Sequence, residues 1–444
     1  MAVMNPHAAG IDIGSRFHVV SVGQGSDDVS TFGVFTDDLE RLCAHLSEHG
    51  IKTVAMESTG YYWKPLFVML QSRGFEVFLV NARHIKDAKG VKSDPHDSRR
   101  LQKLHSLGLL TASHQPEAEV EELRSYCRQR RYLVAEKSRH VNRMYKALTL
   151  MNVQLGNVLS DLDGKSGMDI VRAIVAGKRD PKALAALARP EVKASRETLE
   201  RSLQGTWRKE CLFELGQCVA LYDVYEQRIQ ACDVEIERLL RDCVASQNEG
   251  DIPPLPKGKA LTQKRAHKND PRFDVGGWAA RLTNGLDLLA IPGMGRGSLL
   301  TVLSEVGWDL KKKFESGKHF TSWLGLSPNV QKSGGKVLSS KTKKNKCIAA
   351  QAFRQAANSV GNMKEHPLNS FFTRLAVKKG RLVAIVATAR KLALIFYNMI
   401  AKGEDFNYVP NEEYEKRLRQ KQVHRIQKLI AQHNINTNEL SFAV

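Results

Sequence analysis

The sequence has few acidic residues, no paired cysteine motif and no long uninterrupted apolar run. Its 47 aspartates and glutamates face 67 lysines and arginines, which gives a formal net charge of +20. Seven cysteines are scattered without a CxxC pair, which argues against a zinc site and for reduced thiols in a cytoplasm. The longest apolar run, residues 392–400, is interrupted by Asn398 and is too short to span a membrane. The first ten residues lack the basic start and apolar core of a signal peptide.

The excess of basic charge favours a polyanionic partner, because each phosphate that a cation neutralises releases counterions and adds affinity. Nucleic acid is the first expectation, an anionic membrane surface is the alternative, and no spanning segment supports a membrane partner. A chain of 444 residues is long enough for two to four domains with sizeable cores.

The first hundred residues predict alternating strands and helices. Apolar periodicity indicates strands over residues 9–13, 17–22, 29–35, 53–56 and 76–80, and helices over residues 36–49, 61–73 and 97–107. The resulting order, βββαβαβα, resembles the ribonuclease H-like fold, the scaffold of RuvC-type nucleases and many transposases. Fold alone does not give function, so a function must be inferred from the acidic residues on this scaffold.

Four carboxylates fall where such a fold would bring them together. Asp12 lies in the first strand, Glu57 ends the fourth, and Asp94 and Asp97 lie one turn apart at the start of the last helix. The first and fourth strands are neighbours in a ribonuclease H-like sheet, and the last helix packs across their ends. Converging carboxylates repel unless a divalent cation separates them, and oxygen-only ligands favour Mg²⁺ or Mn²⁺. Two such ions suit phosphoryl transfer.

Each acid taken alone has a plainer interpretation as a turn former, a surface charge or a helix cap; the strand order favours a metal site. Three histidines, His84, His96 and His105, are left out of the ligand set, because isolated histidines at such positions are more often surface residues.

The middle of the chain predicts long helices. Over residues 116–155, apolar residues recur every seven positions, a coiled-coil period, at Val120, Cys127, Val134, Val141 and Leu148. The opposite face is basic and includes Arg124, Arg128, Arg131 and Arg139. It is either the solvated face of an ordinary bundle helix or a nucleic-acid-binding face on a helix that packs on a partner. A second long helix is expected over residues 195–245.

In the C-terminal part, residues 285–307 predict two short helices around Pro292 to Gly295. The pattern is similar to a helix-hairpin-helix, whose glycine turn presents backbone amides to a phosphate. An ordinary helical hairpin would look much the same. Gly293 and Gly295 are therefore candidate phosphate contacts, and further helices are expected over residues 348–359, 369–377, 382–401 and 412–432.

Residues 325–343 read GLSPNVQKSGGKVLSSKTK and place Ser333 before Gly334 and Gly335. Glycines let backbone amides approach an anion, and lysines neutralise phosphate, so a hydroxyl held here could attack a phosphodiester. The surrounding lysines are Lys332, Lys336, Lys341 and Lys343. Local composition alone favours a solvated basic turn. Ser327, Ser339 and Ser340 are competitors, but only Ser333 precedes the two glycines.

Taken together, the sequence resembles the DEDD transposases, the bridge-RNA-guided serine recombinases of the insertion-sequence one-hundred-ten family. The resemblance covers residues 10–107 and 286–403 and rests on IDIGS, MESTG, KSDPHDS, AIPGMG, and GLSP followed by QKSGGK. In KSDPHDS, Ser93 and Ser98 replace the threonine and alanine usual in the family; no acid is lost.

The resemblance implies a metal set of Asp12, Glu57, Asp94 and Asp97 and a nucleophile, Ser333, that forms a covalent phosphoserine with DNA. It also implies donor and target duplex DNA, a non-coding bridge RNA, and a homo-oligomer, dimeric or tetrameric in the active complex, in a bacterial, nucleoid-associated setting. Two rivals stay open: a RuvC-like junction nuclease that uses water, and a non-catalytic nucleic-acid-binding scaffold.

The expected architecture is α/β plus α, in five regions. These are a RuvC-like ribonuclease H-fold domain (1–112), a helical coiled-coil region (113–246), a basic proline-containing linker or insertion (247–284), a mainly helical serine domain (285–405) and a charged helical tail (406–444).

Overall fold

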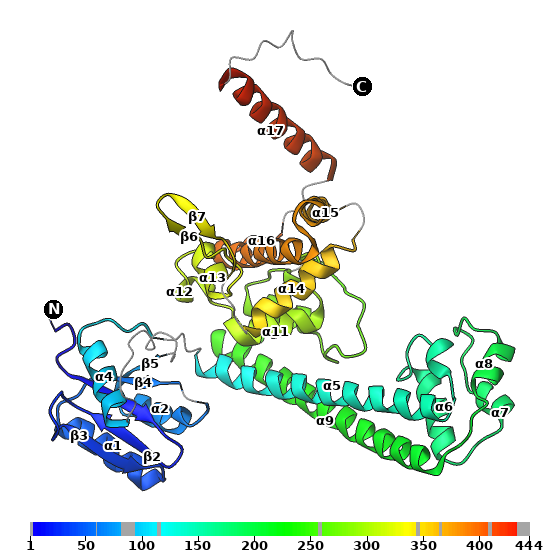
Figure 1. The fold of residues 1–444 in the computed structure, drawn as a ribbon, viewed down its shortest axis with the longest axis horizontal. Helices are drawn as coiled ribbons and strands as arrows, with labels where there is room; N and C mark the ends of the chain where they lie inside the picture. The colour runs from blue at the N-terminus through cyan, green and yellow to red at the C-terminus, as the bar shows by residue number, and fades with distance from the viewer. Residues whose placement is uncertain are drawn as a thin grey trace. The chain divides into compact units, whose positions relative to one another are not determined.

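The computed structural model describes residues 3–58, 60–80, 94–112, 117–255, 260–342, 347–363, 366–406 and 411–432. The chain forms two compact units, Met1–Gln115 and Pro116–Val444. The first carries a mixed α/β sheet and the second is mainly helical (Figure 1). The expected fold class is confirmed at this level.

The first unit is built on a five-stranded sheet in the order β3-β2-β1-β4-β5. β1 is antiparallel to β2 and parallel to β4, so the first and fourth strands are neighbours, as expected. Its elements are β1 (Ala8–Ile13), β2 (Phe17–Ser21), β3 (Val29–Gly33), α1 (Thr36–Glu48), β4 (Thr53–Glu57), α2 (Trp63–Ser72), β5 (Glu76–Val80) and α4 (Asp94–Ser106).

The two faces of this sheet are covered differently. Ile11 and Met56, which are register partners, pack with Leu42 of α1 and Leu66 of α2 in one core. Helix α4 crosses the other face. Gln102 of α4 donates from Nε2 to the carbonyl of Ala8 at 3.1 Å, and the chain before β1 donates to the last turn of α4. Helix α4 therefore runs antiparallel to β1, with its first turn toward the strand's carboxyl end.

Gly10 is what allows α4 to approach β1 so closely. A Cβ at this position would lie 2.3 Å from both the carbonyl oxygen of Ser98 and the backbone nitrogen of Gln102. We expect Gly10→Ala to destabilise the first unit by about 1–3 kcal/mol through overpacking against rigid backbone. Urea unfolding of the full chain measures this. Gly25→Ala, where a Cβ would meet only the carboxylate of Asp28 at 3.1 Å, is the matched control; equal losses for the two variants would contradict the packing argument.

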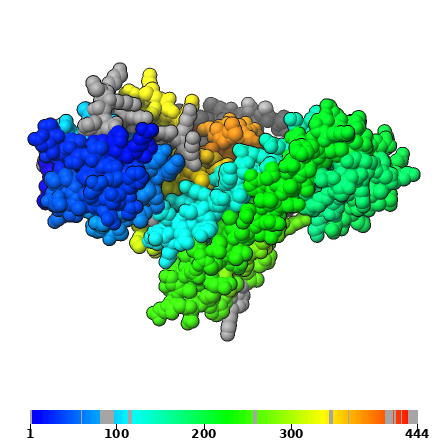
Figure 2. All heavy atoms as spheres, turned by 90° about the horizontal axis from the view of Figure 1, so that it is seen from below, coloured from blue at the N-terminus to red at the C-terminus, as the bar shows by residue number. Residues whose placement is uncertain are grey.

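In the second unit, two long antiparallel helices, α5 (Ala118–Leu150) and α9 (Lys209–Gln247), pack along most of their length. Figure 2 shows the cyan residues of α5 beside the green residues of α9. At one end of the pair lies a small helical cluster with its own core. It comprises η1 (Leu155–Asn157), α6 (Lys165–Val175), α7 (Pro181–Ala185) and α8 (Arg196–Ser202).

The other end of the α5–α9 pair joins the C-terminal core. That part contains α10 (Val275–Leu282), η2 (Leu288–Ala290), α11 (Arg296–Val306), α12 (Leu310–Lys313), α13 (Gly317–Trp323), β6 (Gln331–Ser333), β7 (Lys336–Ser339), α14 (Ile348–Val360), α15 (Pro367–Lys379), α16 (Arg381–Lys402) and α17 (Asn411–Gln432). Helix α16 is long and apolar enough to cross a membrane. Its buried residues Leu392, Ala393 and Phe396 belong to this core, as in a core helix of a globular domain.

Of two expectations for the helical region, one needs correction. The coiled-coil period of α5 is met by α9 of the same chain; Val120, Val141 and Leu148 are buried in the cores that the two helices share. The single helix expected over residues 195–245 is two helices, α8 and α9. Between them the chain packs against the end of α5, where the backbone nitrogen of Thr206 donates to the carbonyl of Met151 at 2.8 Å.

Residues 247–284 were expected to form a linker, but the later part of this stretch belongs to the C-terminal core. Phe273 and Trp278 are buried in the C-terminal core, and Val275–Leu282 forms α10. Residues just before them are held by the α5–α9 pair: the carbonyl of Asn269 accepts from Arg130 Nη1 at 3.1 Å. Buried aromatic side chains, which a proline count does not reveal, fix this segment.

Candidate functional site

Asp12 and Glu57 lie at the carboxyl ends of neighbouring parallel strands. Ile11 of β1 is paired in register with Met56 of β4, and Asp12 and Glu57 are the next residues along each strand. Because side chains alternate between faces, both acids share the face that α4 covers, opposite the apolar core. Asp12 is half-buried and lines a surface pocket of about 240 Å³ together with Gly14, Ser15 and Arg16.

The other two acidic positions begin α4. Asp94 is its first residue and Asp97 lies in its first turn, and the antiparallel run of α4 over β1 directs this turn toward the strand ends that carry Asp12 and Glu57. The Asp97 carboxylate lies 3.8 Å from Nδ1 of His96. Ser98, the departure from the family motif, is buried against Gly10. The backbone thus directs all four acidic positions to one end of the sheet.

The donor set at this end of the sheet fits a hard divalent cation, since every member is a carboxylate. Among the residues whose side chains the structure describes, no group of three or more His, Cys, Asp or Glu is close enough to hold a metal. Residues 81–93 and the side chain of Asp94 lie outside that description, and so does His84. The four-acid metal set stays a prediction.

His105 is a buried structural residue. The residue is 1% exposed, and its Nε2 lies 2.8 Å from Thr53 Oγ1, on the face of the sheet under α4. Leaving His105 out of the ligand set agrees with this position, although the expectation that it lies at the surface was wrong. Burial lowers the pKa of His105 to about 4, so the ring is neutral near pH 7.

Because His105 is buried in its neutral form, we expect the first unit to lose stability as the pH falls. The unfolded-state pKa of His105, 6.5, lies above its folded value of about 4, so the unfolded chain binds the extra proton between these values. Stability is therefore fully present above pH 6.5 and is lost as pH falls toward 4. We expect His105→Gln, which keeps a hydrogen-bonding group, to reduce the fall of the urea-unfolding midpoint between pH 7 and pH 4.5. An unchanged profile would contradict this; buried His18, whose pKa is also lowered, remains in both proteins.

Ser333 lies at the tip of a small antiparallel hairpin formed by β6 and β7. It pairs in register with Lys336, and the two residues between them, Gly334 and Gly335, have φ of 53° and 76°. Two consecutive positive φ angles are those of a type I′ turn, which only glycine and a few polar residues adopt readily. The composition of this stretch predicts only a turn; the two-glycine loop between two short runs is the sequence signal of the hairpin.

The hairpin is exposed and carries several lysines beside two exposed apolar residues, Val337 and Leu338. Lys332, Ser333 and Lys336 are all exposed, as is Lys341 beyond β7; Lys343 lies outside the described residues. The competing Ser327 is half-buried, with its hydroxyl 3.0 Å from that of Thr321, and Ser339 is half-buried at the end of β7. Of the described serines in this segment, Ser333 alone combines exposure with a glycine turn.

The glycine turn before α11 is held by other parts of the chain. A Cβ on Gly293 would lie 2.2 Å from the carbonyl oxygen of Ala356 in α14, so this glycine permits close packing. Gly295 is the N-cap of α11, and the next turn already has an anion: Asp270 Oδ1 accepts from the backbone nitrogen of Gly297 at 3.2 Å. The element before the turn is a single 3₁₀ turn, η2, rather than a helix. Phosphate contact at Gly293 and Gly295 stays a prediction, with a carboxylate competing for the amides.

The basic face of α5 is largely engaged within the chain. Arg128 donates from Nε and Nη2 to both carboxylate oxygens of buried Glu305, each at 2.8 Å, and Arg124 donates to the Glu305 carbonyl at 2.6 Å. Arg131 donates to Gln351 at 2.8 Å, and exposed Arg139 pairs with Glu136 at 2.5 Å. The contacts of Arg124, Arg128 and Arg131 attach α5 to α11 and α14, a role that the heptad pattern could not reveal. Nucleic-acid binding by these four arginines stays a prediction.

The sheet order, with acidic residues at the ends of β1 and β4 and at the start of α4, fits a ribonuclease H-like domain, and a separate helical part follows it. Residues 9–153 match the family model of the IS110 DEDD transposase, and residues 287–371 match that of the transposase IS116/IS110/IS902 family. The chain carries both transposase domains of the IS110 family. The two matches support an IS110-family transposase function and imply DNA binding. No curated protein matches the chain.

Proposed function

We propose that this transposase cuts and rejoins DNA strands through attack by Ser333 on a phosphodiester, assisted by Mg²⁺ or Mn²⁺. The observation that carries the proposal is the placement of Ser333 on an exposed glycine turn between Lys332 and Lys336. A hydroxyl in this position is accessible to a DNA backbone, and the lysines on either side can hold the phosphate. The match of residues 287–371 to a transposase domain covers this hairpin.

In the proposed step, Ser333 Oγ forms a bond to phosphorus and the deoxyribose oxygen on the far side of the phosphorus leaves. The serine proton passes to a base or to water, and the leaving oxygen is protonated, so the number of phosphodiester-type bonds is unchanged. Rejoining is the reverse attack by a hydroxyl of another strand and needs no ATP. A bound divalent ion supplies stabilisation of the charge that develops on the phosphate oxygens.

Asp12, Glu57, Asp94 and Asp97 are the residues we assign to holding that ion. Their shared chemistry and their positions at one end of the sheet support the assignment. We further propose that a non-coding bridge RNA selects donor and target duplexes, and that the active form is a dimer or tetramer in which the acids and Ser333 come from different subunits. The cytoplasm is the proposed location.

The test is the covalent intermediate. The full-length protein is incubated with its RNA, donor and target DNA and Mg²⁺, then denatured and resolved by electrophoresis. We expect a protein–DNA adduct whose attached peptide, after digestion, contains Ser333. Cleavage without any adduct would instead favour the water-using nuclease. Guidance by RNA is tested separately, by omitting the RNA or changing its sequence. We expect activity to be lost without RNA; cleavage of any duplex regardless of the RNA sequence would contradict guidance.

A further inference from the structure

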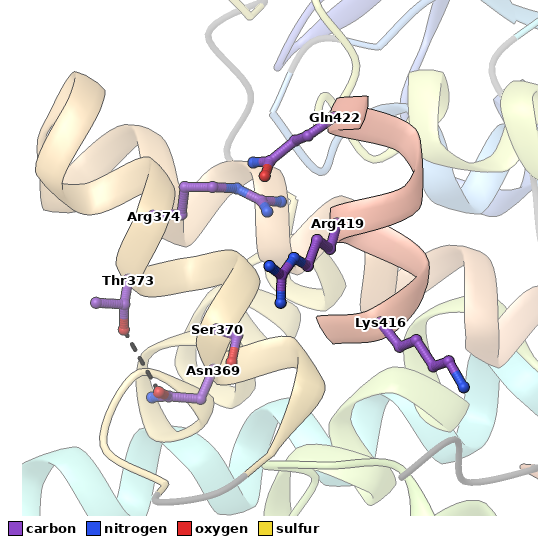
Figure 3. Close-up of a pocket in the computed structure, with 7 residues that line it drawn as sticks. All are labelled: Asn369, Ser370, Thr373, Arg374, Lys416, Arg419 and Gln422. Carbon is purple, nitrogen blue, oxygen red and sulfur yellow. Dashed lines mark hydrogen bonds between the residues drawn. The ribbon is translucent and has the colours of Figure 1, made fainter. Parts of the chain in front are cut away.

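Helices α15 and α17 enclose a basic groove that no site described so far uses. It has a volume of about 880 Å³, and Figure 3 shows Arg374 from α15 and Arg419 and Gln422 from α17 extending into the space between the helices. Among the lining residues that the structure describes, none is acidic. They are Asn369, Ser370, Thr373, Arg374, Lys416, Arg419 and Gln422.

Helix α15 lies in a stretch of the chain with few acidic residues, whereas the start of α17 carries Glu412, Glu413 and Glu415, whose side chains lie outside the described residues. From residue 316 to residue 403 the sequence contains a single acidic residue, Glu365. Within the part of the chain that the structure describes, no carboxylate is paired with Arg374, Lys416 or Arg419. Arg374 and Arg419 enter the groove from opposite walls, and because like charges repel, their approach favours an anionic ligand between them.

The spacing of the cations suits a row of charges better than a single small anion. Arg374 and Lys378 are four residues apart on α15, about 6 Å along the helix axis. Exposed Lys379 continues the row to the corner where Gly380 joins α15 to α16. One strand of a duplex carries a charge about every 3.4 Å along its axis. Such a row along one helix can therefore contact several phosphates of a single strand.

Two large apolar residues stand out of this basic corner. Val377 is 86% exposed and Leu382 is 80% exposed, on either side of Gly380. Exposed aliphatic groups among lysines suit the thymine methyl groups or an opened base step of duplex DNA. RNA has no thymine methyl, and its shallow groove displays polar 2′-hydroxyls. The combination of cations and apolar groups thus favours DNA.

We propose that the α15–α17 groove and the adjoining α15–α16 corner form a second DNA-binding surface, which holds the backbone of duplex DNA apart from the strand that Ser333 attacks. The matched transposase domain ends at residue 371, so most of this surface lies beyond it. The role of this surface in recombination rests on the proposed function, but its binding of DNA does not. Binding of duplex DNA can be measured whether or not Ser333 is the nucleophile.

The experiment measures binding of the full-length protein to a labelled duplex of arbitrary sequence as the salt concentration rises. Each lost phosphate contact lowers the magnitude of the slope of log K against log salt by about 0.9. We therefore expect Arg374→Gln with Arg419→Gln to lower that magnitude by about two, for unrelated sequences alike. Val377→Ser with Leu382→Ser is expected to weaken binding with little change of slope.

The matched control removes two charges elsewhere in the same region. Lys428 lies two and a half turns from Arg419 on α17, on the opposite face of the helix, and Lys402 ends α16 at the far end from Gly380. Lys402→Gln with Lys428→Gln should leave the slope unchanged. Equal slopes for the two double variants, or a loss confined to single-stranded RNA of equal length, would overturn the proposal. Ser333→Ala should bind duplex DNA normally, which separates this result from the test of the nucleophile.

Discussion

Ser333→Ala is expected to abolish the covalent protein–DNA adduct completely while leaving the protein folded. The side chain is exposed at the hairpin tip and pairs only through its backbone with Lys336, so removal of the hydroxyl deletes no packing. The type I′ turn depends on Gly334 and Gly335, not on the serine. The expected defect is therefore chemical, and circular dichroism and DNA binding should match the parent protein.

Ser339→Ala is the matched control for this variant. Ser339 lies on β7 of the same hairpin, opposite Gln331, and carries the same functional group. We expect this variant to form the adduct at the parental rate. Adduct formation by Ser333→Ala, or its loss in Ser339→Ala alone, would reassign the nucleophile.

Asp12→Asn separates the transposase from its rivals. The substitution keeps the size of the side chain but removes the charge needed to hold a divalent cation, so cleavage and adduct formation should both be lost. A water-using nuclease would also lose cleavage with Asp12→Asn, yet would keep it with Ser333→Ala. A scaffold without catalysis would keep its activity in both variants. The pair of substitutions thus gives a different pattern for each of the three functions.

The sequence predicts the sheet because its signals are local. Strand periodicity and helix caps give the order of elements, and the neighbouring positions of β1 and β4 follow from the fold that this order resembles. That neighbourhood in turn places Asp12 beside Glu57 in register. The approach of α4 was less visible; it depends on Gly10, whose missing Cβ is recognised only when the facing residue Gln102 is known.

Contacts between distant residues explain what the sequence did not reveal. The arginines of α5 looked like a nucleic-acid-binding stripe, but Arg128 is held by Glu305, 177 residues further on. The amides at the start of α11 looked open to phosphate, but the Gly297 amide donates to Asp270. In each case a charged residue has a partner that no periodicity or spacing identifies. The Ser333 hairpin was missed for a different reason, because two very short strands carry little periodic signal.

The largest expected effect on stability is that of Asp233→Ala, in the packed face of the α5–α9 pair. Asp233 is 4% exposed; its carboxylate accepts from Arg130 Nε at 2.5 Å and from the backbone nitrogen of Arg272 at 3.3 Å. The substitution leaves the Arg130 guanidinium buried without a counterion, which costs about 3–5 kcal/mol. It also releases the segment that Arg272 anchors, so hydrogen exchange should rise there and in the adjoining turns of α5 and α9.

Because the expected loss comes from an unpaired buried charge, removing Arg130 together with Asp233 tests its cause. Asp242→Ala, on the exposed face of α9, breaks a 2.8 Å contact with Arg238 and should cost at most about 1 kcal/mol. Arg130→Met combined with Asp233→Leu removes both charges and should recover most of the stability lost by Asp233→Ala, because well-packed apolar groups can replace a buried ion pair. Differential scanning calorimetry of the unfolding transition of the second unit measures the stability of all three variants. If the double variant is no more stable than Asp233→Ala, the loss comes from packing and not from the uncompensated charge of Arg130.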